Sequence, residues 1–211
     1  MAKIPPVAYV GILALAAGGA FVGHSLLMKS APAAAVAGVV PGKDAAASTY
    51  AALSPDLQVR YKPLYDQLVL RKWKEANRET YLIATLQVAG PLSAKDGHIV
   101  ASEMTTFPAA DLHAIDDLWS TASHNKFGFK TQEIILHNKA EHDWKKLYHK
   151  LGWDEIQMSY SATERQWDFA PGHEPDWDDL HTGELPTLER GYNYAVSLDA
   201  RLAACGFTGQ P

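Results

Sequence analysis

The densest group of possible metal ligands in the sequence is the stretch HEPDWDDLH, from His173 to His181. Its two imidazoles and four carboxylates are ligand types that divalent cations accept. Their spacing forms no regular ligand pattern, however, and PDWDD does not predict a helix that would hold them on one face. The sequence leaves a metal site and a solvated acidic loop as alternatives, and it favours the loop.

The other polar residues form no recognisable catalytic motif. Serine, histidine and acidic residues are plentiful, but no glycine-framed serine follows a predicted strand. The two glycine patterns that bind phosphates, G-x-x-x-x-G-K-[ST] and G-x-G-x-x-G, do not occur. His137, His142 and His149 lie in helical segments rich in lysine, and we interpret them as surface residues rather than ligands. The sequence therefore predicts a protein that is not an enzyme.

Two phenylalanines flank a glycine directly after a polar turn, in the segment NKFGF. Gly128 permits a tight backbone bend or the close approach of a ligand. Phe127 and Phe129 are either two core residues that anchor the turn between helices, or include at least one ring that faces a ligand. We expect the second arrangement.

Helices must position these residues, because apolar side chains recur at spacings of three and four along most of the chain. Ser54 and Pro55 indicate a helix start, with serine as N-cap and proline in the first turn. Pro63 is expected to divide this segment into two helices.

The remaining helices follow the same periodicity. Asn138 and Glu141 fit a capping box that would begin one of them. The segments are Glu75 to Ala89, a helix from near Pro108, two helices between Thr131 and Gly152, and Tyr192 to Ala204. Since no run of alternating residues competes with them, the predicted fold class is all-α, a single compact helical domain.

An acidic segment, residues 154–189, differs from the helical part. It contains ten acidic residues against one basic residue, Arg165, and three prolines. We expect a long irregular loop, and loops of this length in compact domains are usually functional or disordered. Trp153, Trp167, Phe169 and Trp177 argue against disorder, because disordered segments contain few aromatic residues.

Composition limits the possible functions. A chain of 211 residues with 47% hydrophobic residues can bury one core. The formal net charge of −5 and the lack of a basic stripe exclude a typical nucleic-acid-binding protein. Cys205 is the single cysteine, so neither an intramolecular disulfide nor a thiolate cluster is possible.

The N-terminal segment predicts membrane attachment. Val7 to Met28 contains no Asp, Glu, Lys or Arg, and its length suits a helix that crosses a bilayer. The alternative is a secretory signal peptide cleaved within SAPAAAVAG. We expect a membrane anchor (1–29), a flexible Ala/Pro/Gly linker (30–53), a helical binding domain (54–190), and a C-terminal helix and tail (191–211).

The motifs FPxxDLxxID and LWxxxSxxxFGFxxQ, between Phe107 and Gln132, resemble the genomes-uncoupled family of porphyrin-binding proteins. The likeness spans roughly Tyr61 to Trp153 and continues more weakly to about Pro186. The resemblance implies an all-helical domain, likened to a cupped hand, that holds a porphyrin in a cleft and is not an enzyme. The family regulates magnesium chelatase in chlorophyll synthesis, and this chain resembles a membrane-anchored, divergent member.

The resemblance also implies a ligand and a site. A porphyrin is a flat apolar macrocycle with two carboxylates on one edge, so it requires an apolar wall and a few cations. Phe127 and Phe129 would form that wall, with Lys126 at its rim. The ligand would be protoporphyrin IX or Mg-protoporphyrin IX. The expected contacts are Trp119, Ser120, Lys126, Phe127, Phe129, Gln132, Trp153, Arg165, Trp167 and Arg190.

Two departures from the family pattern bear on this expectation. Ala76-Asn77 stands where the family commonly has Ala-Asp, and the late loop offers only Arg165 and Arg190 to carboxylates. We expect a tetrapyrrole carrier or regulator in the thylakoid membrane of a cyanobacterium or plastid, with the magnesium chelatase large subunit as a possible partner. The alternative is a ligand-free module that docks on a membrane complex such as a photosystem.

Overall fold

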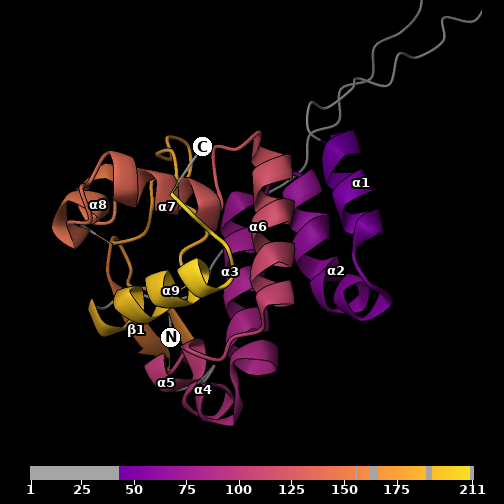
Figure 1. Cartoon of the computed structure of the whole chain (residues 1–211), viewed down its shortest axis with the longest axis horizontal. Helices are drawn as coiled ribbons and strands as arrows, with labels where there is room; N and C mark the ends of the chain where they lie inside the picture. The colour runs from indigo at the N-terminus through magenta and orange to yellow at the C-terminus, as the bar shows by residue number, and fades with distance from the viewer. Residues whose placement is uncertain (1–42, 155, 162–165, 189–191, 210–211) are drawn as a thin grey trace, which may run out of the picture. The chain divides into compact units, whose positions relative to one another are not determined.

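The computed structural model describes residues 43–154, 156–161, 166–188 and 192–209. These residues form helices and one short antiparallel hairpin (Figure 1). The elements are α1 (Lys43–Ala52), α2 (Pro55–Val69), α3 (Trp73–Ile83), the π-helical η1 (Ala84–Ala89), α4 (Pro91–Asp96), α5 (Ala101–Met104), α6 (Ala109–Ser123), α7 (Phe129–Asn138), α8 (Trp144–Lys150), β1 (Met158–Ser161), β2 (Gln166–Phe169) and α9 (Tyr192–Ala204).

The main core lies where α2, α3 and α6 pack against one another, with α1 against α2 and α6. The apolar faces predicted from the sequence supply most of its side chains, and burying them provides the main favourable free energy of folding. The largest fully buried side chains are Trp119, Tyr61, Phe107, Phe127, Phe129, Leu64, Leu68, Ile83, Met104, Leu112, Ile115 and Leu118.

Helix α2 is continuous through Pro63, so the predicted division into two helices is wrong. Proline removes one main-chain donor and releases the carbonyl of Val59. That position faces outward, since the Val59 side chain is 80% exposed and Pro63 is exposed too. Tyr61, Leu64 and Leu68 are buried on the opposite face. Core packing on both sides of the proline therefore holds the helix together.

Two further expectations about local structure are corrected. Lys43 to Ala52 is helical rather than part of a flexible linker. Helix α8 does not begin with the predicted capping box of Asn138 and Glu141. Its N-cap is Asp143, whose Oδ1 accepts hydrogen bonds from the main-chain N–H groups of residues 145 (2.9 Å) and 146 (3.1 Å). An N-cap carboxylate satisfies donors that have no partner within the helix.

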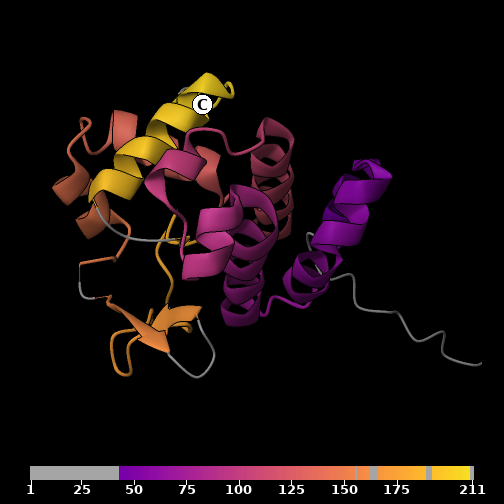
Figure 2. The same ribbon diagram turned by 90° about the horizontal axis from the view of Figure 1, so that it is seen from below.

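The prediction of an entirely α-helical domain is also corrected, because the acidic segment contains the hairpin (Figure 2). Strands β1 and β2 pair in antiparallel register, with Met158 opposite Phe169 and Ser159 opposite Asp168. Each strand has four residues. So short a run offers two alternating pairs at most, too few to stand out from an irregular loop.

The predicted membrane span, Val7 to Met28, lies outside the residues that the structure describes. Of the helices that it does describe, none has both the length and the apolar content that crossing a bilayer requires.

Candidate ligand-binding cleft

A cleft of about 240 Å³ lies between helix α3 and the β1–β2 hairpin. Its lining combines two cations, two carboxylates, aromatic side chains and a buried amide. The lining residues are Lys74, Glu75, Asn77, Arg78, Tyr81, Met158, Asp168, Phe169 and Thr187. This mixture of apolar walls and a few placed polar groups is typical of small-molecule sites.

Helix α3 supplies the charged wall. Lys74, Arg78 and Tyr81 recur at spacings of four and three, so they lie on one face of the helix and all three border the cleft. The hairpin supplies Met158 and Phe169, which face each other in register across β1 and β2. An anionic apolar molecule would find cations on the helix and apolar contacts on the hairpin.

The inner end of the cleft is fixed by a reciprocal pair of hydrogen bonds. The Asn77 amide nitrogen donates to Thr187 Oγ1 at 2.9 Å, and the Thr187 main-chain N–H donates to Asn77 Oδ1 at 2.7 Å. Asn77 is only 4% exposed. Its amide both donates and accepts here, which a carboxylate cannot do without a proton. The departure from Ala-Asp noted in the sequence therefore has a structural role.

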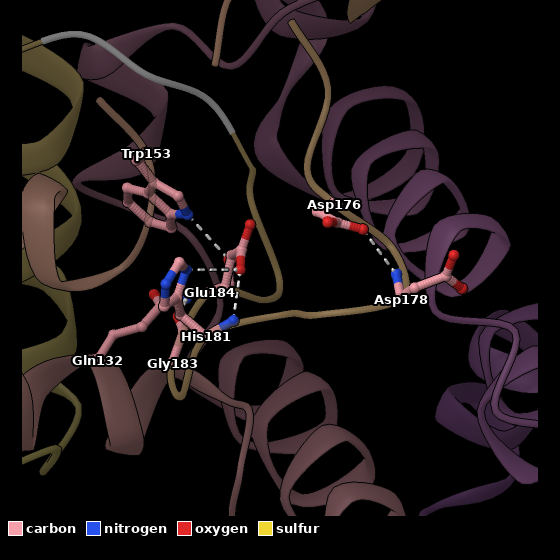
Figure 3. Close-up of polar contacts among 7 residues, drawn as sticks. All are labelled: Gln132, Trp153, Asp176, Asp178, His181, Gly183 and Glu184. Carbon is pink, nitrogen blue, oxygen red and sulfur yellow. Dashed lines mark hydrogen bonds and ion pairs between the residues drawn. The ribbon is translucent and has the colours of Figure 1, made fainter. Parts of the chain in front are cut away.

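Two more side chains hold the segment 183–188 in place (Figure 3). Gln132 Nε2 donates to the carbonyls of Gly183 and Pro186, both at 3.0 Å. Trp153 Nε1 donates to the carbonyl of Glu184 at 3.0 Å. The C-terminal end of the acidic segment is thus tied to helix α7, and Trp153, which precedes the segment, is bonded to the same end.

Glu174 of the acidic loop forms an ion pair with Lys74, one of the two cations that line the cleft. Lys74 Nζ lies 2.5 Å from Glu174 Oε2, which also accepts a hydrogen bond from Trp177 Nε1 at 2.9 Å. These hydrogen bonds from Lys74 and Trp177 lower the pKa of Glu174. The Trp177 ring packs edge-on against Phe169, with the ring centroids 5.7 Å apart. The acidic loop therefore already pairs with Lys74, whose ammonium an anionic ligand would need.

The predicted aromatic wall lies in the core instead. Phe127 and Phe129 are 1% and 0% exposed, and the Phe127 ring packs edge-on against Trp73, with centroids 5.3 Å apart. Trp119 is fully buried, and its Nε1 donates to Thr80 Oγ1 at 2.9 Å. Both rings are buried, as in the alternative left open by the sequence, but Phe127 also lines a cavity of about 210 Å³ together with Lys126. The expectation that one ring faces a ligand therefore stays a prediction.

The glycine between them permits a close approach of helices α6 and α7. Gly128 has φ of 118°, and a Cβ there would lie 2.7 Å from both Asp116 Oδ1 and Ser120 Oγ. With that space open, Asp116 Oδ1 accepts a hydrogen bond from the Lys130 N–H at 2.9 Å. The Asp116 carboxylate thus caps α7, whose own N-cap residue has no side chain. Burial raises the pKa of Asp116 to about 6.

The structure does not bring the other predicted contacts together in the cleft. Ser120 supports the turn, its hydroxyl 3.4 Å from the Phe127 carbonyl, and Gln132 anchors the loop. Lys126 is exposed and lines a different cavity, of about 210 Å³. Only the main chain of Trp167 is described, in β2. Arg165 and Arg190 lie outside the described residues.

Sequence reasoning missed Lys74, Arg78 and Phe169 as cleft residues. The signal was present in α3, where the two cations share a helix face with Tyr81. The metal hypothesis for HEPDWDDLH also gains no support. In that stretch, Asp176 Oδ1 accepts the N–H of Asp178 at 3.1 Å (Figure 3). Among the described residues, no three ligand atoms of this stretch lie close enough together to hold a metal ion.

The described residues thus form a helical domain with a cleft between one helix and a hairpin. The family model described as GUN4-like matches residues 54–188, which is more than half of the chain. The chain therefore belongs to the GUN4-like family.

Comparisons with individual proteins agree with this assignment. The chain is 29% identical over 131 residues to the tetrapyrrole-binding protein, chloroplastic, of Arabidopsis thaliana, covering 58% of this chain and 46% of that protein. It is 34% identical over 127 residues to the uncharacterized protein ycf53 of Pyropia yezoensis, covering 58% and 52%. The chain spans about half the length of the curated relatives it matches.

Two solved structures share the fold. The structure of GUN4 from Chlamydomonas reinhardtii matches with a TM-score of 0.59 and 24% identity, over 75% of this chain and 95% of that one. The ligand-free structure of Arabidopsis thaliana GUN4 matches with a TM-score of 0.53 and 26% identity, over 66% and 91%.

Proposed function

We propose that this chain is a non-enzymatic tetrapyrrole-binding protein that holds protoporphyrin IX or Mg-protoporphyrin IX in the cleft between α3 and the hairpin. The observation that carries the proposal is the lining of that cleft, which opposes Lys74 and Arg78 to Met158 and Phe169. Membership of the GUN4-like family and the name of the Arabidopsis relative support the choice of ligand.

The lining matches the chemistry of the ligand. The propionates would meet the ammonium of Lys74 and the guanidinium of Arg78, and charge-assisted bonds of this kind are the strong ones. Tyr81, Met158 and Phe169 would contact the macrocycle. Since 240 Å³ is below the ~300–1,000 Å³ of typical ligand pockets, one edge of the ring would stay in solvent. Arg165, Trp167 and Arg190 are proposed as further contacts from the adjacent loop and strand.

The cellular setting is a second part of the proposal. The N-terminal apolar segment would tether the domain to a thylakoid membrane in a cyanobacterium or plastid. A tether raises the effective concentration of a domain near membrane enzymes without any new contact. The protein would then deliver or sense tetrapyrrole for chlorophyll synthesis, with the magnesium chelatase large subunit as partner.

One observation favours a ligand-free docking module as a second candidate. An open cavity of about 550 Å³ in the acidic segment is lined by Asp154, Glu174, Asp176, Asp179 and Glu184, among others. A surface of this charge would attract a basic partner, such as an exposed face of a photosystem complex.

A fluorescence titration separates the two candidates. Full-length protein is titrated with deuteroporphyrin and its magnesium form while tryptophan emission is recorded. We expect saturable quenching, with binding at least about tenfold weaker in Arg78→Gln, because losing a charged hydrogen-bond partner costs about 1.5–3 kcal/mol. Phe127→Ala is unsuitable as a probe because that ring is part of the core.

The matched control is Lys62→Gln, which removes an exposed cation paired with Asp66 on α2. It should leave the titration unchanged. Absence of saturable quenching at micromolar protein would reject the tetrapyrrole proposal, and a stoichiometric membrane partner recovered with the tagged protein would then support the docking module.

A further inference from the structure

A second polar cluster lies between α7 and α9, on residues that the cleft does not use. One ligand atom each from Glu133 and His137, on α7, and from Asp199, on α9, all lie within 4.8 Å of one another. Glu133 and His137 are four residues apart and so share a face of α7. The cluster thus joins the C-terminal helix to the helix that begins at the FGF turn.

One carboxylate oxygen of Glu133, Oε2, is buried without a hydrogen-bond partner among the described residues. Glu133 is 3% exposed, and no described residue donates a hydrogen bond of acceptable geometry to its Oε2. Nε2 of His137 lies 3.2 Å from it. An unsatisfied buried carboxylate oxygen is costly, and few native structures retain one without a ligand, an ion or a functional reason.

The apolar surroundings raise the free-energy cost of ionising both Glu133 and Asp199. Glu133 and Asp199 both border a narrow apolar pocket lined by Leu147, Trp153 and Leu202, among others. The Asp199 carboxyl lies beside the Glu133 carboxyl, with one oxygen of each within 4.8 Å of the other. Two carboxyl groups in such a place need either a shared proton or a cation between them.

We propose that Glu133, His137 and Asp199 bind a divalent first-row metal ion, with Zn²⁺ as the reference ion. One imidazole and two carboxylates form a mixed nitrogen and oxygen set that suits Zn²⁺, Mn²⁺ or Fe²⁺. Three protein ligands leave at least one coordination position open. The proposal concerns a site distinct from the cleft and does not depend on the proposed function.

The geometry is close to what a metal requires. Ligands about 2.0–2.2 Å from a tetrahedral Zn²⁺ lie about 3.3 Å from one another. Glu133 and His137 already meet this spacing at 3.2 Å. The Asp199 side chain is half-buried, so a change of rotamer can bring its carboxylate oxygen from within 4.8 Å of the other two ligand atoms to the spacing that the metal requires.

The His137 ring is held in position from two sides. Its centroid lies 4.2 Å from that of His142, in an edge-to-face arrangement. The main chain of Gly209 packs directly on it, since a Cβ there would lie 2.5 Å from His137 Cβ. Asn138 secures that chain by donating to the Gly209 carbonyl at 2.7 Å. Fixed imidazole orientation is a feature of built metal sites.

Metal analysis of the full-length, untagged protein tests the site. After treatment with a chelator, the protein is dialysed against Zn²⁺, and in parallel against Co²⁺, whose visible absorption reports coordination. We expect about one ion per chain. Glu133→Gln and Asp199→Asn should each weaken binding at least about tenfold. Zn²⁺ should also raise the melting temperature, because a ligand that binds only the folded state stabilises it.

The control is His149→Gln, which removes an exposed imidazole 2.7 Å from Asp154 and so reports surface binding. It should bind as the parent chain does. Circular dichroism checks the fold of each variant, and Asp199→Asn covers the case in which the more deeply buried Glu133→Gln fails to fold. Equal binding by parent and Asp199→Asn, or no saturable binding of Zn²⁺ or Co²⁺, would overturn the proposal. If the parent chain binds no metal and Glu133→Gln is more stable than the parent chain, the two carboxyl groups share a proton instead.

Discussion

At the scale of single residues, the motifs that carry the family resemblance build the scaffold rather than the cleft. Asp111 of FPxxDLxxID accepts from Arg60 at 2.5 Å and from the Tyr61 hydroxyl at 2.8 Å. Asp116 caps α7, and Gly128 leaves room for it. A sequence motif marks any position where few residue types fit, whether or not that residue contacts a ligand. A buried carboxylate with two hydrogen-bond partners, such as Asp111, restricts the residue type as strongly as a ligand contact does.

Replacing Gly128 tests this scaffold role. Gly128→Ala would place a methyl group 2.7 Å from two oxygen atoms, at a φ of 118° that side chains disfavour. We expect a loss of about 2–4 kcal/mol in the free energy of unfolding, measured by urea denaturation. Gly172→Ala is the matched control, with φ of 78° and no atom within 4 Å of the added Cβ. Equal losses in the two variants would show that backbone strain alone is responsible.

Two carboxylates that accept hydrogen bonds at helix N-termini, Asp116 and Glu103, have opposite pKa shifts. The raised pKa of Asp116, about 6, means that the folded state holds its proton more tightly than the unfolded state. This stabilisation is complete below the unfolded pKa near 4 and is lost as pH rises through about 6, a change of about 3 kcal/mol. The stability gained by Asp116→Asn over the parent chain should therefore increase between pH 4 and 7 in urea titrations.

Glu103 provides a control of opposite sign for that experiment. Burial alone would raise its pKa, but hydrogen bonds from the Ser93 hydroxyl and the N–H groups of Leu92 and Ser93 outweigh burial and lower it. Its contribution is present at neutral pH and is lost as pH falls through the lowered pKa. A flat difference for Asp116→Asn across this range would contradict the assignment.

At the scale of elements, the acidic loop and helix α3 meet through Glu174 and Lys74. In the cleft proposal, Glu174 competes with a propionate for the same ammonium. Glu174→Gln should therefore tighten binding of deuteroporphyrin by up to about fivefold, the scale of an exposed ion pair. The fluorescence titration described for Arg78→Gln measures this change in affinity.

Glu141→Gln is the matched control for Glu174→Gln. It removes another exposed carboxylate, 2.5 Å from Lys146 and outside the cleft lining. It should not change the affinity. Weaker binding in Glu174→Gln would instead make the loop part of the binding surface.

At the scale of the whole molecule, the sequence predicted the helical core well and the cleft poorly. Helix α9 begins and ends as predicted, and α2 and α6 begin within a residue of the expected starts. Periodicity reports burial locally, which is why it succeeded there. The cleft joins Lys74 to Phe169 across a loop and a short hairpin, and no local pattern records that they meet.

Membrane attachment is a prediction for the intact chain. Full-length protein should sediment with membranes and resist carbonate extraction, while a variant that begins at Lys43 should be released. The core residues from Ala46 onward remain in that variant, so it should still fold. A mature protein that begins within SAPAAAVAG, found by mass spectrometry, would favour a cleaved signal peptide instead.

The hydrogen bond from Trp153 Nε1 to the Glu184 carbonyl also affects which sequence changes the acidic segment can tolerate. The hydrogen bond from Trp153 joins the start of the segment to Glu184 near its end, and Gln132 holds that end to α7, so these contacts offset the entropy of closing the loop whatever residues lie between. Loop closure entropy grows only slowly with length, by about 0.6 kcal/mol for each doubling. Substitutions and insertions there would therefore cost the helical core little. The charge of the acidic segment could therefore change between members of the family while the helical core keeps its structure.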